Sequence, residues 1–255
     1  ISSSIPRILP DCVVNAASYV GGGVAAGEIV TLFGSGIGPF DLARAQLTAD
    51  RSIGTSLAGT RILFDGVPAP LLFVSDRQSS AVVPYAVAGR TSVAVQVEYK
   101  GVLSDPVKVP VFGARPGLFS MDGSGQGQGA VLNEDGTLNS PSNPARTGSI
   151  ISVFATGGGE TAPGVGDGRI VGDVLPRTTL PVSAFFDIGR SGDEGAIAPK
   201  KGEVLYAGGV SGSIAGLMQV NVRVPANSGI TGNAVQFALI IGEQWNAFQV
   251  TLAVR

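Results

Sequence analysis

Apolar and polar residues alternate along most of this chain with the period of two that is typical of half-buried β-strands. The clearest example is 93–99, where three valines and a tyrosine alternate with Ala, Gln and Glu. The same alternation covers 107–111, 220–224 and 248–254. Two further runs, 29–33 and 150–154, are apolar on both faces and predict central strands packed on both sides.

Turn signals separate these runs, and little in the chain predicts a helix. Pairs that suit a tight reversal stand where hairpins would need them: Asp65-Gly66, Lys100-Gly101, Asp135-Gly136 and Ile241-Gly242. The 38 glycines and 16 prolines fit many turns that join short strands. Only 41–46 predicts a short turn of helix. We therefore expect an all-β protein built from β-sandwiches.

The chain contains an internal repeat. The run 27–36 (GEIVTLFGSG) recurs in looser form as 148–157 (GSIISVFATG), and Val83-Pro84 recurs as Val224-Pro225. The offsets are 148 − 27 = 121 and 225 − 84 = 141, so the second copy carries extra loop residues between the two echoes. A period of this size predicts a duplicated β domain. We expect two tandem sandwiches, 1–114 and 115–255, with an insertion at about 188–202 in the second.

Composition excludes several classes of function. Charged residues make up 14% of the 255 residues, the formal net charge is −2, and no run of basic residues is present. Nucleic-acid binding normally needs such a basic footprint, so we expect no nucleic-acid partner. No apolar stretch approaches the roughly 18–20 residues of a membrane-spanning helix.

The absence of histidine narrows the chemistry further. The chain has no His and a single Cys, Cys12. Ser-His-Asp and Cys-His catalysis and His-ligated zinc are therefore excluded. One cysteine cannot form an internal disulfide, and without histidine its thiolate would need another activator. We interpret Cys12 as an incidental or buried thiol.

Several ordered motifs resemble one known family. The segment 15–19 (NAASY), followed by 27–39 (GEIVTLFGSGIGP), is similar to the Solibacter-type C-terminal domain family, an uncharacterised module at the ends of acidobacterial secreted proteins. The further matching segments are 64–70, 81–85, 116–119, 133–144, 204–209 and 219–225. The resemblance covers about 14–255. Ser79-Ser80-Ala81 departs from it, because a more usual Ile-Asn-Ala precedes the Val-Val-Pro strand in the family.

This resemblance implies a fold and a location. It implies tandem immunoglobulin-like domains similar to IPT/TIG domains, in a protein that is secreted, periplasmic or on the cell surface. It implies no catalytic residues and no cofactor.

A ligand site is predicted at one exposed tryptophan. Trp245 lies in Gly242-Glu243-Gln244-Trp245-Asn246, which we expect to form a hairpin at one tip of the second sandwich. A tryptophan on an exposed loop suggests a contact surface. Trp245, with Gln244 and Asn246, is therefore the candidate ligand-binding group, and aromatic faces suit sugar rings.

Other candidate sites have simpler explanations. The glycine clusters 21–23, 123–129 and 157–159 lack the following helix that a phosphate-binding loop needs, and turn glycines explain them. Loop carboxylates, namely Glu160, Asp167, Asp173, Asp193 and Glu194, could offer oxygens to calcium, but their spacing matches no known calcium loop and a solvated surface explains them. We predict no metal site.

These observations predict a non-catalytic extracytoplasmic module for adhesion, attachment or display. Its partners would be an extracellular polysaccharide, another protein, or other domains of a longer parent chain. A carbohydrate-binding accessory module of a secreted enzyme is the first alternative, and a hydrolase using paired carboxylates is the second. A passive spacer is a further alternative that no sequence feature separates from a weak binder.

Overall fold

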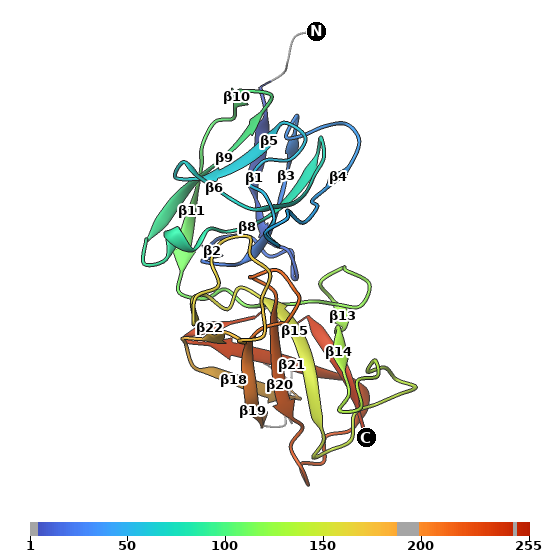
Figure 1. The fold of residues 1–255 in the computed structure, drawn as a ribbon. Helices are drawn as coiled ribbons and strands as arrows, with labels where there is room; N and C mark the ends of the chain where they lie inside the picture. Colours follow the sequence, from blue (N-terminus) through green and yellow to red (C-terminus); the bar gives the residue numbers. More distant parts are fainter. Residues whose placement is uncertain (1–4, 188–198, 247–248) are drawn as a thin grey trace.

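The chain is an all-β protein (Figure 1). The computed structural model describes residues 5–187, 199–246 and 249–255. Within them the only helical element is a single 3-10 turn, η1 (Tyr85–Val87). The short helix predicted at 41–46 is wrong, because Ala43 and Arg44 instead form β4 (Ala43–Arg44) and pair with Val74 and Phe73. Six residues hold too few internal hydrogen bonds to resist such pairing.

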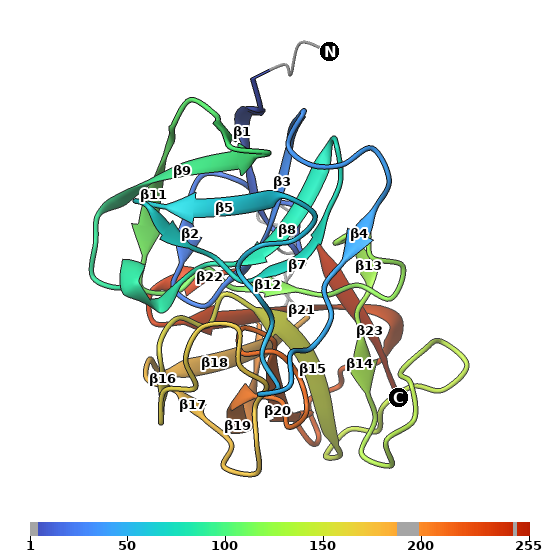
Figure 2. The ribbon, with the colours of Figure 1, turned by 45° about the horizontal axis from the view of Figure 1, so that its top comes forward.

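Residues 7–112, called here the N-terminal half, form two sheets that face each other (Figure 2). One sheet has the order β1 (Arg7–Asn15), β3 (Ile29–Ser35), β8 (Gln78–Val82), β7 (Leu71–Val74), β4. The other has the order β2 (Val24–Ala25), β11 (Val107–Phe112), β9 (Ser92–Tyr99), β5 (Thr60–Phe64), β6 (Val67–Pro68), with β10 (Val102–Leu103) beside β9. The order β1-β3-β8-β7 facing β5-β9-β11 is that of the immunoglobulin sandwich.

Residues 117–254, the C-terminal half, repeat this strand order in one continuous sheet. Its path is β12 (Gly117–Leu118), β15 (Ile150–Thr156), β20 (Met218–Arg223), β19 (Lys200–Gly209), β18 (Val182–Phe186), β21 (Gly232–Ile241), β23 (Val250–Val254), β13 (Gly127–Gln128). Four short strands lie beside this path: β14 (Val131–Leu132), β16 (Thr161–Ala162), β17 (Arg177–Thr178) and β22 (Gln244–Trp245). The sheet is continuous because β19 pairs with both β20 and β18.

The two sequence copies occupy equivalent strands. The repeated runs 27–36 and 148–157 contain β3 and β15, which pair antiparallel with β8 and β20 respectively. In both halves a short strand also pairs in parallel with a strand near the half's end, β2 with β11 and β13 with β23. The sequence repeat is therefore a repeat of strand order. Most of the expected insertion at 188–202 lies outside the described residues, and Lys200–Gly202 begin β19.

Each half has its own hydrophobic cluster. One cluster runs from Ile8 to Val109, and the other runs from Ala114 to Val254. The predicted boundary at residues 114 and 115 lies where one cluster gives way to the other, and the assignment of two domains stays a prediction. Of the two runs predicted to be buried on both faces, β3 is so buried and β15 is not. Alternate residues of β15 (Ile150, Ser152 and Phe154) are half-buried, and Ser152 hydrogen-bonds to Asn221 at 3.0 Å.

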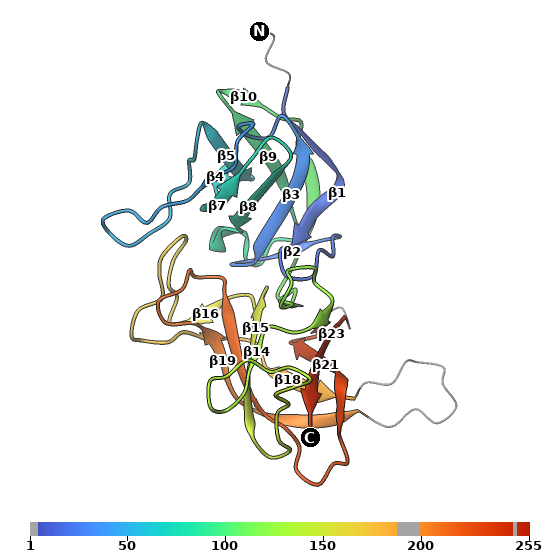
Figure 3. The same cartoon turned by 90° about the vertical axis from the view of Figure 1, so that its right-hand side faces the viewer.

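The two halves are stacked end to end, and an extended loop of the N-terminal half reaches the C-terminal half (Figure 3). The Ile53 N–H donates to the Gly168 carbonyl at 2.8 Å, and the Ile170 N–H donates to the Arg51 carbonyl at 3.2 Å. The Arg169 guanidinium lies 3.0 Å from the Asp50 carboxylate. Because backbone contacts join the halves at this loop, the linking segment 113–116 is not their only connection.

Candidate functional site

A buried carboxylic acid lies where the two halves meet. Glu28 precedes β3 and is fully buried. Its Oε1 accepts a 2.8 Å hydrogen bond from Asn15 Nδ2, and its Oε2 accepts a 2.7 Å bond from the Ala25 N–H. The Asn15 amide also donates to the Arg115 carbonyl at 3.0 Å, so this side chain bridges β1, Glu28 and the linking segment.

Arg115 holds the linking segment between the two halves. Its guanidinium donates to the Gly21 carbonyl and lies 5.7 Å from the centroid of the Phe112 ring. Its backbone N–H donates to the Gly157 carbonyl at 2.7 Å. The same residue therefore contacts the N-terminal half through its side chain and the C-terminal half through its backbone.

Thr156 connects the two halves directly through its side chain. Its Oγ1 accepts a 2.8 Å hydrogen bond from the Ile29 N–H, next to Glu28, and donates at 2.8 Å to the Gly216 carbonyl. One hydroxyl thus satisfies a buried donor of β3 and an acceptor of the loop before β20. Asn15, Glu28, Arg115, Thr156 and Gly216 are called the junction below.

Close backbone approach explains two glycines at this place. A Cβ added to Gly117 would lie 2.0 Å from Asn15 Oδ1, and one added to Gly157 would lie 1.9 Å from the Arg115 carbonyl oxygen. Gly157 also has φ +79°, which a residue with a side chain rarely adopts. The sequence predicts turn residues at 157–159. These glycines also allow the backbone of the C-terminal half to approach the linking segment closely.

Burial dominates the electrostatics of the junction. It raises the pKa of Glu28 to about 8, against the smaller opposing effects of the Ala25 N–H, the Arg115 charge and the Asn15 amide. Glu28 is therefore mostly neutral at pH 7. Tyr85, whose hydroxyl lies over Gly27, also has a raised pKa because of burial, and so it stays neutral across the same range.

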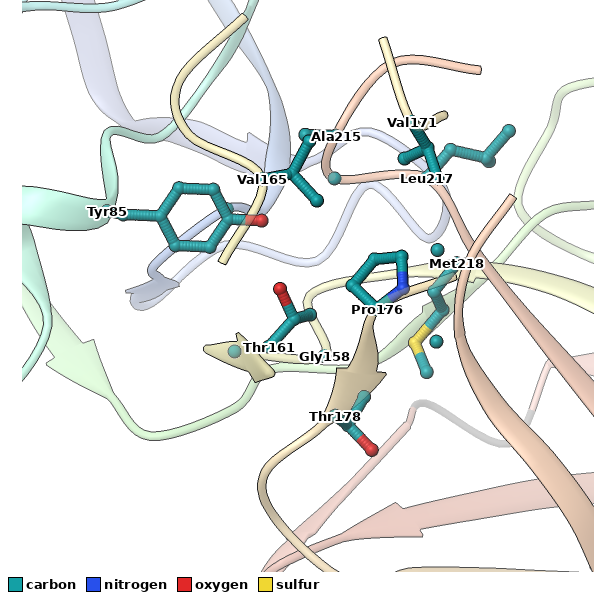
Figure 4. A pocket seen from close by; sticks show the side chains of 15 residues that line it. Tyr85, Gly158, Thr161, Val165, Val171, Pro176, Thr178, Ala215, Leu217 and Met218 are labelled. Atoms are coloured by element: carbon teal, nitrogen blue, oxygen red, sulfur yellow. The ribbon is translucent and has the colours of Figure 1, made fainter. Parts of the chain in front are cut away.

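The cavity between the halves is small. Figure 4 shows Tyr85 of the N-terminal half facing Thr161, Pro176 and Met218 of the C-terminal half. The cavity volume is about 20 Å³, which holds roughly one water molecule. Its walls are mainly apolar side chains and glycines. A substrate-sized molecule does not fit there.

The predicted ligand-binding residues separate into two groups. Trp245 is 51% exposed, lies in β22, and stacks on Phe185 with ring centroids 6.0 Å apart and an interplanar angle of 20°. Gln244 lies with Trp245 along a groove whose other wall carries Ser18 and Arg115. The segment 242–246 therefore forms a hairpin, as predicted, but this hairpin lies beside the junction and not at a free tip of the molecule.

Asn246, in contrast, is buried and stabilises the hairpin through hydrogen bonds. It is 2% exposed, its Oδ1 accepts a 2.6 Å hydrogen bond from the Leu239 N–H, and its own N–H donates to the Leu239 carbonyl at 3.1 Å. Asn246 thus fixes the hairpin that presents Trp245. A ligand-binding role for any of these three residues stays a prediction.

The loop carboxylates are dispersed. Asp167 Oδ1 accepts a 2.8 Å hydrogen bond from the Tyr85 N–H, which ties its loop to the N-terminal half. Asp193 and Glu194 lie outside the described residues. Among the residues that the structure describes, no three Cys, Asp or Glu side chains come together in a group that could hold a metal ion. Nor does this part of the chain contain a helix long and apolar enough to cross a membrane.

The sequence analysis did not identify the junction, although a signal was present. Glu28 is a single carboxylate at the edge of an apolar strand, and the repeat places Ser149 at the matching position of the second copy (149 − 121 = 28). Thr156 likewise corresponds to Ser35 (156 − 121 = 35). The two copies therefore differ at both of these junction positions.

Comparison with known proteins provides no family. No family description matches the chain, and no curated protein shows significant similarity to it. The resemblance to the Solibacter-type family stays a prediction.

Replacing Glu28 should change the pH dependence of stability. A carboxyl whose pKa is raised from 4.5 to about 8 on folding binds its proton more tightly in the folded state. Its contribution is fully present below pH 4.5 and is lost at ~1.4 kcal/mol per pH unit as the pH rises toward 8. The free energy of unfolding of Glu28→Gln, measured by urea titration, should fall less between pH 5 and pH 8 than that of the parent protein. Equal slopes for the two proteins would contradict the assignment.

Thr156→Val should destabilise the protein by about 2–4 kcal/mol, because it leaves a buried N–H and a buried carbonyl without their partner while conserving volume. Thermal and urea unfolding would measure the loss. Thr251→Val, at a half-buried position in β23, is the matched control and should change the free energy of unfolding by less than about 1 kcal/mol. A Thr156→Val protein as stable as this control would show that the hydroxyl bridge adds nothing.

Proposed function

We propose that this chain is a non-catalytic extracytoplasmic module for adhesion, attachment or display. The observation that carries the proposal is the closed junction, where buried polar contacts join the halves around a cavity of about 20 Å³. Loops, exposed sheet faces and open surface hollows such as the one of about 320 Å³ beside Arg44 and Leu57 remain as the contact surface, which suits binding to a large partner better than turnover of a small one. The extracytoplasmic location rests on the family resemblance.

Retention on surfaces tests this proposal. The whole chain would be incubated with insoluble polysaccharides (cellulose, chitin and xylan) and with a cell-envelope fraction, and in parallel with chromogenic glycosides and esters. We expect retention on at least one surface and no turnover of any substrate. Turnover above that of the heat-unfolded protein would contradict the non-catalytic assignment. If the chain binds none of these surfaces, the result would contradict attachment and would favour a passive spacer.

A carbohydrate-binding accessory module is the second candidate, and the Trp245–Phe185 stack favours it. An indole held against a second ring presents its surface with little conformational freedom to lose on binding. The flat apolar faces of pyranose rings pack on such surfaces, while Gln244, Ser18 and Arg115 along the adjoining groove offer hydrogen-bonding groups to sugar hydroxyls.

Trp245→Ala should weaken retention in a polysaccharide affinity gel by at least tenfold, since it removes the stacking surface. Phe40→Ala is the matched control, because Phe40 is an aromatic residue that is 91% exposed and does not line the groove. We expect the control to migrate like the parent protein in every gel. Unchanged retention of Trp245→Ala would remove the carbohydrate candidate without affecting attachment through another surface.

A further inference from the structure

Arg115 brings a positive charge without a carboxylate partner to the groove beside Trp245. The five ion pairs among the described residues all involve other arginines. The nearby Glu28 is mostly neutral at pH 7, because burial raises its pKa to about 8. Among the described residues no carboxylate lines the groove, whose other members are Asn15, Ser18, Val20, Pro116, Gln244 and Trp245. The charge of the groove therefore suits an anionic group.

The Arg115 guanidinium lies against one wall of the groove and retains hydrogen-bond donors. Its Nη2 donates to the carbonyl of Gly21, which follows Val20 of the groove wall, and a Cβ added to Gly22 would lie 3.7 Å from the same nitrogen. In the part of the chain that the structure describes, Nη1 makes no hydrogen bond, and it is not among the buried polar atoms without a partner. Nη1 therefore remains accessible to a ligand, and the planar guanidinium fork matches the two oxygens of a carboxylate.

Trp245 supplies a flat surface next to this charge. Its ring packs on Phe185 with centroids 6.0 Å apart, yet the residue is still 51% exposed. Its strand, β22, lies at the end of the C-terminal half that faces the N-terminal half (Figure 1). A sugar ring that packs on the indole would direct its substituents along the groove, toward Ser18, Gln244 and Arg115.

The size of the groove selects the group that enters it. Its volume is about 50 Å³, which corresponds to roughly four water molecules. A whole pyranose ring does not fit into this space, but a planar carboxylate does. The ring of a ligand would thus stay on the indole, while its acidic substituent enters the groove.

We propose that this groove binds the uronic acid units of an acidic polysaccharide: Trp245 packs against the sugar ring, and Arg115 pairs with its carboxylate. The assignment of this ligand rests on the carbohydrate-binding role proposed above and adds the class of sugar. The formal net charge of the chain is −2, so general attraction between a polyanion and the protein does not account for such binding. Recognition comes from the local arrangement of one ring and one guanidinium.

Isothermal titration calorimetry with matched ligands tests the proposal. Oligogalacturonate, oligoguluronate and glucuronate-containing oligosaccharides would each be compared with their methyl esters at pH 7, because esterification removes the charge and keeps the ring. At least one of the three should bind at least tenfold more tightly than its ester, since a charge-assisted pair is lost in the ester. Dextran sulfate should bind at least tenfold more weakly than this uronate, because a tetrahedral sulfate ester is bulkier than a planar carboxylate.

Two groove variants and one control locate the site. Arg115→Gln should abolish the preference for the uronate over its ester. Gln244→Glu should weaken uronate binding at least tenfold, because the new carboxylate repels the ligand and pairs with Arg115, and it should change ester binding less than about threefold. Gln46→Glu changes the net charge equally at an exposed position outside the groove, and it should bind like the parent protein. If Arg115→Gln does not fold, Gln244→Glu and its control provide the test.

The possible failures are distinguishable. Equal binding of every uronate and its ester would overturn the proposal and would leave a neutral carbohydrate as the ligand. Dextran sulfate binding as tight as that of the best uronate, or equal losses in Gln244→Glu and Gln46→Glu, would show nonspecific ion exchange. If no uronate or ester binds while a neutral polysaccharide gel retains the protein, the class of sugar is wrong. If no carbohydrate binds at all, the carbohydrate-binding role itself is contradicted.

Discussion

The structure depends on the burial of one carboxyl group between two hydrophobic clusters. Glu28 belongs to neither cluster, yet it is fully buried, because Asn15, the Ala25 N–H and the linking segment enclose it. Burial of a polar group is tolerated only where its hydrogen bonds are made. Around this carboxyl, the Asn15 amide also bonds to the Arg115 carbonyl and lies against Gly117, and Thr156 bonds to the next residue, Ile29.

The two halves share one strand order but differ in the burial of corresponding strands and in the residues that they contribute to the junction. β3 and β15 correspond in sequence and in pairing, but β3 is buried on both faces while one face of β15, with Ile150, Ser152 and Phe154, is only half-buried. The difference also appears at the junction, where Glu28 corresponds to Ser149 and Thr156 corresponds to Ser35. The strand order thus follows the sequence repeat, and the two copies differ at residues that lie at the contact between them.

The junction also determines which surfaces remain for a partner. The cavity beside Tyr85 has a volume of only about 20 Å³, and the β21–β22 hairpin lies next to Ser18 and Arg115 along a second groove of about 50 Å³. Trp245 therefore stands beside a groove with walls from both halves, so that any change in their contact would alter the groove. Arg115 takes part in the junction and also lines this groove.

The sequence alone determined the all-β class, the repeat and the positions of six strands (β3, β9, β11, β15, β20 and β23), because alternation and turn glycines depend on neighbours along the chain. Lys100-Gly101, with φ of 49° and 78° in the β9–β10 hairpin, is one such local feature. Tertiary structure alone decided that Ala43–Arg44 pair as a strand and that Asn246 is buried while Trp245 is exposed. It also decided that Glu28 lies near Arg115 and that Ile29 bonds to Thr156. Asn15 and Arg115 are 100 residues apart in the chain. Their contact depends on how two folded halves pack, and no local pattern of hydrophobic and polar residues encodes that packing.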